Sequence, residues 1–434
     1  MLNNRLSGLA AIVAMLALSA CASLPWPATS SEPAPQAGAS GDPIVLLIGL
    51  DGLRFDAIDR HSAPNLTALA ARGTRPERMY SVMPTKTFVN FYSIATGLYP
   101  ENHGMLSNSP WDNEAQNLFS ARSGDTQDPF WWGGEPIWKT AEDQGLRAHV
   151  MFWLGSEVEG QRPTLWHAYE HDRPYDTRVD EVLAWFDAPE AEQPDFAAVY
   201  FDHVDSVTHR NGIFGEAEAS SVALVDGLVG DLVAGLEERG LIERTTILIV
   251  SDHGMSNVSL ERLIFVDDYD PLDGIFIAEH AGRFGAGLEP YLYGFGEPED
   301  IDRAFEALQG AHPHLSVYRR GEMPDHFRIN HPTRGPDLLI TADPGWQITM
   351  RDTDLTNPYY LSLQATHGWD NYHDDMGATF IGAGPIFPAG SRPAGFDNVN
   401  VYGLIACALG IEPAATDGDP AEIVRITGGL CPAR

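Results

Sequence analysis

Three continuous apolar runs constrain the fold of this chain more than any other feature. They occupy residues 44–50, 196–201 and 246–250, and each contains several β-branched or aromatic residues. Such runs are typical of strands buried on both faces, as in parallel sheets. The segments between them carry helical periodicity, most clearly at residues 216–239. The sequence therefore predicts an α/β fold with a mostly parallel central sheet and helices on both faces.

Shorter patterns add further elements to this prediction. Helices are expected at residues 64–72 and 136–144, and strands at 149–153 and 378–381. Residues 260–345 change character, with short alternating runs and a helix near 299–309, so we interpret them as a small α+β insertion. The apolar run at 338–340 is expected to return the chain to the main sheet.

Side chains with metal-binding chemistry follow the three apolar runs. A single Asp after a strand is usually a turn or capping residue. The carboxyl ends of parallel strands, however, meet at one edge of a sheet, where such folds carry their sites. Carboxylate and imidazole groups together suit zinc or a similar divalent ion. The candidates, including one histidine from a fourth segment, are Asp51, Asp205, His209, Asp252, His253 and His367.

Thr87 is expected where a helix begins. Pro84 favours an extended residue before it, and apolar residues recur at helical spacing from Phe88 onward. A hydroxyl at this position can cap the helix. It can also approach a phosphoryl group, because the N-terminal end of a helix attracts anions.

Two motifs beside Thr87 resemble those of a known family. Residues 84–90 read Pro-Thr-Lys-Thr-Phe-Val-Asn, and residues 96–104 read Thr-Gly-Leu-Tyr-Pro-Glu-Asn-His-Gly. They are similar to the nucleophile motif of the nucleotide pyrophosphatase/phosphodiesterase family, in the alkaline phosphatase superfamily. The resemblance extends over residues 43–417, with two departures: Val89 replaces a proline and Thr208 a glycine. It implies an alkaline-phosphatase-like fold.

The resemblance also implies a site and a reaction. It assigns Thr87 as the nucleophile of zinc-dependent phosphodiester and pyrophosphate hydrolysis in nucleotides, which passes through a phosphothreonine and releases nucleoside monophosphates. Asn108 would bind a non-bridging phosphate oxygen, and Phe88 and Tyr169 would stack on the base. Two Zn²⁺ per chain are implied, one held by Asp205, His209 and His367, the other by Asp51, Thr87, Asp252 and His253.

Other functions of the same framework stay open. Some relatives cleave choline phosphodiesters or lysophospholipids with an aromatic and acidic cage for the quaternary ammonium, and the many acidic residues here leave that substrate class open. Phe88 and Tyr169 could also both be core aromatic residues. A phosphomonoesterase needs strong positive charge, whereas Asn108 is neutral. A binding protein without activity would be expected to have lost ligands, and every predicted ligand is present.

The charge balance restricts the partners. The chain has 27 Lys and Arg against 61 Asp and Glu, a net charge of −34. Such a surface repels nucleic acids and anionic membranes, so no nucleic-acid binding is expected. A small nucleotide or phosphodiester can still bind where metal ions make the site locally positive.

The N-terminal residues predict where the protein is located in the cell. Residues 1–20 resemble a signal peptide, and Leu18-Ser19-Ala20-Cys21 resembles a bacterial lipobox, which implies a lipid on Cys21. An ordinary cleaved signal is the alternative. Residues 21–42 are expected to be a flexible tether and 43–434 the catalytic domain. With Ala22 after the cysteine, the resemblance favours the periplasmic face of the outer membrane, where Cys407 and Cys431 could pair.

Overall fold

The computed structural model describes residues 41–281 and 287–433. These residues belong to one compact unit. The predicted signal peptide, Cys21 and all but the last two residues of the predicted tether therefore lie outside the described residues.

A six-stranded sheet forms the centre of the unit, in the order β17-β8-β1-β7-β5-β6. Five strands run parallel, and β17 at one edge runs antiparallel to β8. Every residue of β1, β7 and β8 is buried. The predicted fold class is confirmed, with a mixed sheet. The strands are β1 (Ile44–Leu50), β5 (Ala148–Met151), β6 (Leu165–His167), β7 (Phe196–Phe201), β8 (Thr245–Val250) and β17 (Phe380–Ala383).

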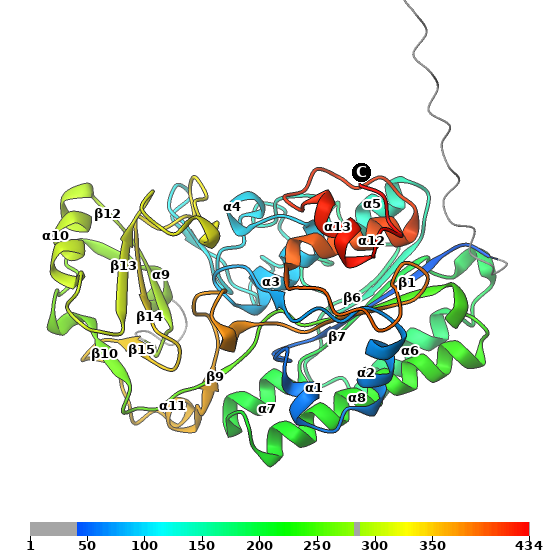
Figure 1. The fold of residues 1–434 in the computed structure, drawn as a ribbon. Helices are drawn as coiled ribbons and strands as arrows, with labels where there is room; N and C mark the ends of the chain where they lie inside the picture. Colours follow the sequence, from blue (N-terminus) through cyan, green and yellow to red (C-terminus); the bar gives the residue numbers. More distant parts are fainter. Residues whose placement is uncertain (1–40, 282–286, 434) are drawn as a thin grey trace, which may run out of the picture. The chain divides into compact units, whose positions relative to one another are not determined.

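Helices cover both faces of this sheet (Figure 1). One face carries α1 (Ala57–Arg60), α2 (Pro64–Arg72), α6 (Tyr175–Trp185), α7 (His203–Asn211) and α8 (Glu216–Glu238). The other carries α3 (Thr87–Thr96), α5 (Ile137–Asp143), α12 (Val401–Leu409) and α13 (Pro420–Ile426). By length and hydropathy α8 could also cross a membrane, but it packs against α2, α6 and α7, and buried core helices have the same composition.

A second, antiparallel sheet follows in the order β11-β12-β14-β13. Its elements are β11 (Ile275–Ile277), β12 (Tyr291–Gly296), α10 (Pro298–Leu308), β13 (Leu315–Arg319) and β14 (Leu338–Ala342). The prediction that residues 338–340 return to the main sheet is therefore wrong. All five residues of β14 are buried, and a fully buried run does not reveal which sheet it joins. The boundaries predicted for the insertion stay a prediction.

Further short strands and helices lie outside these two sheets. Four strand pairs are β2 (Met79–Tyr80) with β18 (Phe396–Asp397), β3 (Trp111–Asp112) with β4 (Asn117–Leu118), β9 (Ser256–Asn257) with β16 (Ala365–Thr366), and β10 (Leu263–Phe265) with β15 (Gln347–Thr349). Three short helices are α4 (Pro100–His103), α9 (Ala278–Ala281) and α11 (Pro358–Ser362). The strand predicted at 149–153 is shorter, because Phe152 has a φ of 65°, which no extended strand accommodates.

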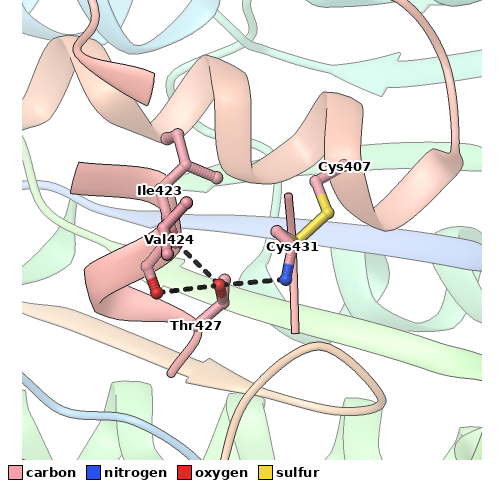
Figure 2. Close-up of a disulfide and its surroundings, with 5 residues drawn as sticks. All are labelled: Cys407, Ile423, Val424, Thr427 and Cys431. Atoms are coloured by element: carbon pink, nitrogen blue, oxygen red, sulfur yellow. Dashed lines mark hydrogen bonds between the residues drawn. A yellow bond between two sulfur atoms is a disulfide. The ribbon is translucent and has the colours of Figure 1, made fainter. Parts of the chain in front are cut away.

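A disulfide joins Cys407 on α12 to Cys431 after α13, with the two Cα atoms 6.1 Å apart (Figure 2). Thr427 lies beside it: its hydroxyl donates to the Ile423 carbonyl oxygen at 2.7 Å and accepts from the Cys431 amide at 3.2 Å. The disulfide therefore holds the C-terminal segment to α12, and the Thr427 hydrogen bonds fix Cys431 to the end of α13. The pairing that the sequence left open is present.

Removing this disulfide should destabilise the protein without changing its chemistry. The two cysteines are 24 residues apart in the sequence, and closing a loop of that length stabilises the folded state by about 3 kcal/mol. We expect the Cys407→Ser/Cys431→Ser variant to show a lower urea midpoint, and reductant to lower the wild-type midpoint equally. Equal midpoints for variant and wild type would contradict this.

Candidate active site

Thr87 is the first residue of α3, as predicted. The N-cap residue is Lys86, in an extended conformation, and within the described residues no side chain caps this helix. Thr87 therefore does not cap this helix. Its half-buried side chain instead lines a cleft together with Asp51 and Asp205.

Asn90 fixes the loop that carries Thr87. Its side-chain amide donates to the carbonyl oxygens of Val82, Pro84 and Lys86 at 3.3, 3.1 and 3.0 Å, and its oxygen accepts from the Val82 amide at 2.7 Å. Asn90 is fully buried. A satisfied buried network of this kind rigidifies the backbone around it, so the position of Thr87 is well defined.

Asp51 follows β1 and approaches Asp205 closely. Gly52 makes this approach possible: its φ is 69°, and a Cβ there would lie 2.9 Å from the Asp205 Cα. Only glycine fits at such a point. The Asp205 amide also donates to the Asp51 carbonyl oxygen at 3.1 Å, and the Gly52 amide donates to Asp252 Oδ1 at 3.0 Å.

Asp205 and His209 lie on a helix and not in a strand-end loop. They occupy positions i and i+4 of α7, on one face of the helix, and His209 Nε2 lies 3.2 Å from Asp205 Oδ1. The strand-end expectation was therefore correct for Asp51, Asp252 and His253, whereas α7 carries the other pair to the same place.

The three histidines present the same ring nitrogen to the site. Their Nδ1 atoms each face a backbone carbonyl oxygen: His209 that of Ala365 at 2.8 Å, His253 that of Gly254 at 2.9 Å, and His367 that of Thr85 at 2.6 Å. A carbonyl only accepts, so each Nδ1 carries the proton and the neutral ring has its lone pair on Nε2. Metal-ligating histidines are typically oriented in this way.

The candidate ligand atoms form two adjoining groups, Asp51 with Asp252 and His253, and Asp205 with His253 and His367. Within each group they lie within 4.8 Å of one another. Four buried atoms here have no hydrogen-bond partner among the described residues: Asp51 Oδ1, Asp205 Oδ1, Asp252 Oδ2 and His253 Nε2. Buried polar atoms are costly when unpaired, so these residues fit metal ions. His253 belongs to both groups, so the two candidate positions are adjacent.

Burial and neighbouring charges also shift the pKa values of three of these candidate ligands. Burial raises the pKa of Asp51 well above its usual range, and the charges of Asp252 and Asp205 raise it further. Burial alone would raise the pKa of Asp205, but the neighbouring His209 lowers it. Burial, together with the neighbouring His253, lowers the pKa of His367 well below its usual value, which keeps that ring neutral.

The cleft beside Thr87 has a volume of about 400 Å³ and contains the predicted substrate residues Phe88, Asn108 and Tyr169. Asn108 Oδ1 accepts from the Phe88 amide at 3.0 Å. Since that amide can only donate, the Asn108 NH₂ group is turned away from it. Tyr169 is 45% exposed, so it is not a core residue.

Several residues of the cleft were not predicted from the sequence. Trp132 packs against Phe88 with ring centroids 6.1 Å apart, and Tyr200 donates a hydrogen bond to Asp51 Oδ2. Lys86 lines a second cleft with Asn108, His209 and His367. Strand alternation could have placed Tyr200 on one face of β7, but no pattern in the sequence identifies its partner.

The fold and the site together define an α/β protein of the alkaline phosphatase superfamily with a candidate metal centre. The sequence matches the family described as type I phosphodiesterase / nucleotide pyrophosphatase over residues 45–370, and the chain belongs to this family.

Individual relatives agree with this assignment. A venom phosphodiesterase of Crotalus durissus collilineatus is 33% identical over 387 residues, which cover 88% of this chain. Ectonucleotide pyrophosphatase/phosphodiesterase family member 3 of Rattus norvegicus is 32% identical over 403 residues, or 91% of this chain. These matches cover 46% and 45% of the relatives, so the chain spans about half the length of the curated relatives it matches.

Solved structures show the same fold. Murine ectonucleotide pyrophosphatase/phosphodiesterase 5 superimposes with a TM-score of 0.79 at 26% identity, covering 88% of this chain and 99% of that one. An inactive variant of that murine protein in complex with AMP gives a TM-score of 0.80 at 25% identity, covering 89% and 100%.

Proposed function

We propose that this chain hydrolyses phosphodiester and pyrophosphate bonds in nucleotides, with Thr87 as the nucleophile and nucleoside monophosphates as products. The observation that carries the proposal is the position of Thr87, at the start of α3 in a cleft shared with Asp51 and Asp205. The names of the relatives and the AMP complex of a structural neighbour support the substrate class.

Two zinc ions per chain are part of the proposal. Asp205, His209 and His367 would hold one, and Asp51, Thr87, Asp252 and His253 the other. Bound zinc would lower the pKa of an attached oxygen and stabilise the attacking and leaving oxygens of an in-line displacement. The four buried atoms without a hydrogen-bond partner among the described residues and the common orientation of the histidines support this assignment.

Thr87 Oγ1 attacks phosphorus, and the bond to the leaving oxygen breaks. The hydroxyl proton is lost to solvent, and the leaving group departs as an alkoxide or phosphate oxygen that is protonated by water. The phosphothreonine then reacts with water, which releases the nucleoside monophosphate and restores the hydroxyl. The N-terminal end of α3 favours the negative charge that develops on the phosphoryl group.

Asn108 and the backbone amide of Thr87 serve the phosphoryl group. The Asn108 NH₂ group, turned away from the Phe88 amide, donates to a non-bridging oxygen. Fixed donors of this kind stabilise charge in the transition state without reorganising. The Phe88 and Tyr169 rings stack on the nucleobase. Such stacking accepts any base and contributes about 1–3 kcal/mol per base to binding.

A choline phosphodiester is the second candidate substrate. The carboxylates of Glu157 and Asp202 line the same cleft as the aromatic rings of Tyr169 and Trp132. Aromatic faces and carboxylates together attract quaternary ammonium groups.

A kinetic panel on the purified protein separates the candidates. It compares a nitrophenyl ester of a nucleoside monophosphate, nitrophenyl phosphorylcholine and nitrophenyl phosphate. We expect the highest kcat/KM for the nucleotide ester. Faster turnover of the choline ester would favour the second candidate, and a preference for nitrophenyl phosphate would indicate a monoesterase.

The Tyr169→Ala variant tests base stacking. Losing one stacked ring should raise KM for nucleotide diesters about 5- to 160-fold, corresponding to about 1–3 kcal/mol. A bis-nitrophenyl phosphate has no base, so its KM should change little. If both substrates are affected equally, Tyr169 does not recognise the base.

We also propose that Cys21 carries a lipid that holds the protein at the periplasmic face of the outer membrane. The disulfide between Cys407 and Cys431 supports an oxidising compartment. Labelling with a fatty-acid analogue should be lost in Cys21→Ser, and persistent labelling would refute the anchor.

A further inference from the structure

Asp51 uses its two carboxylate oxygens differently. Oδ2 accepts a hydrogen bond from the Tyr200 hydroxyl. Oδ1 lies 3.5 Å from His253 Nε2 and has no hydrogen-bond partner among the described residues. One oxygen is therefore occupied by the protein, and the other faces the candidate metal position formed with Asp252 and His253.

Tyr200 is held firmly enough to fix this arrangement. It lies on β7 and is 6% exposed, and its ring packs edge-on against Phe91 with centroids 5.3 Å apart. Its carbonyl oxygen accepts from the guanidinium of Arg178 at 2.9 Å, and Arg178 is itself fully buried. The backbone, the ring and the hydroxyl of Tyr200 are thus all anchored.

The main chain of Asp51 is tied to the same strand. Its amide donates to the carbonyl oxygen of Phe201, the residue after Tyr200, at 2.9 Å. A hydrogen bond to the backbone and one to the side chain therefore both connect Asp51 to β7. The carboxylate has little freedom to rotate and offer both oxygens to one ion.

We propose that Tyr200 is a positioning residue that holds Asp51 as a single-oxygen metal ligand. The inference rests on the proposed function, because it assumes a metal ion beside Asp51. Residues that orient a metal ligand typically contribute 10- to 100-fold to metal affinity. Tyr200 also lines the substrate cleft, and the centroid of its ring lies 6.0 Å from the centroid of the Tyr169 ring.

The test is zinc titration of the full chain after removal of metal, with a chromophoric chelator as competitor. Tyr200→Phe keeps the ring and removes only the hydroxyl. We expect 10- to 100-fold weaker zinc binding at one of two positions, and a changed visible spectrum after cobalt substitution. Wild-type affinity and an unchanged cobalt spectrum in Tyr200→Phe would overturn the proposal.

Two further variants exclude a merely structural effect. Tyr92→Phe is the matched control, since Tyr92 is fully buried and its hydroxyl has no partner among the described residues; its zinc affinity should be that of the wild type. In an Asp51→Ala background, Tyr200→Phe should cause no additional loss of affinity. An equal loss in both backgrounds would show that Tyr200 does not act through Asp51. If the wild type itself binds no zinc pair, the proposed function fails and not only this inference.

Discussion

Thr87→Ala should reduce turnover of every phosphodiester by about 10⁴-fold or more, because it removes the attacking oxygen. The fold should be unaffected: Lys86, and not Thr87, is the N-cap residue of α3, and alanine is a good helix former. Steady-state kinetics and thermal unfolding of the same preparation measure both effects. Substantial activity in a folded variant would refute the nucleophile assignment.

The matched control for this variant is Thr87→Ser, which keeps a hydroxyl and should keep measurable activity. Thr85 is nearby but unsuitable. Its hydroxyl donates to the Trp369 carbonyl oxygen at 3.1 Å and accepts from the Gly368 amide at 2.8 Å, and its own carbonyl oxygen orients His367. Thr85→Ala would therefore disturb the loop that carries His367. A loss of activity in that variant would not show whether the nucleophile or the structure of the site is affected.

His209→Ala should lower both metal content and rate. The ring is oriented by the Ala365 carbonyl oxygen and lies beside Asp205, so its loss removes one ligand of a predicted three-residue set. We expect elemental analysis to fall from two zinc ions per chain to about one, with a loss of activity of several orders of magnitude. Excess zinc should restore part of the activity.

His314→Ala is the corresponding control. His314 pairs with Asp343 at 2.9 Å, stacks on Trp346 and belongs to neither candidate metal group. Its metal content and rate should equal those of the wild type. If His209→Ala keeps two zinc ions, His209 is not a ligand.

The middle of the central sheet was predictable because β1, β7 and β8 are buried on both faces, and such runs stand out in a sequence. The half-buried edge strand β6 was not predicted. The bounds of β1 and β7 match the prediction residue for residue. The same signal misled for β14, which is equally buried but belongs to the second sheet. A short buried run rich in β-branched residues indicates a strand, whereas the partner of that strand depends on contacts distant in the sequence.

The cluster of candidate metal ligands was predictable in part, for a related reason. Strand ends converge at one edge of a parallel sheet, so Asp51, Asp252 and His253 are brought together by topology alone. Two details were not: the α7 helix that carries Asp205 and His209, and the hydrogen bond from Tyr200 to Asp51. This hydrogen bond connects neighbouring strands through a side chain. The periodicity of a sequence does not show which polar group a tyrosine hydroxyl contacts.

The stereochemical course at phosphorus tests the central claim most directly. A chiral phosphorothioate diester is hydrolysed in ¹⁸O-labelled water, and the configuration of the product is determined. Each in-line displacement inverts phosphorus, so attack by Thr87 followed by attack by water predicts net retention. Net inversion would show a single direct attack by water and would contradict a covalent intermediate on Thr87.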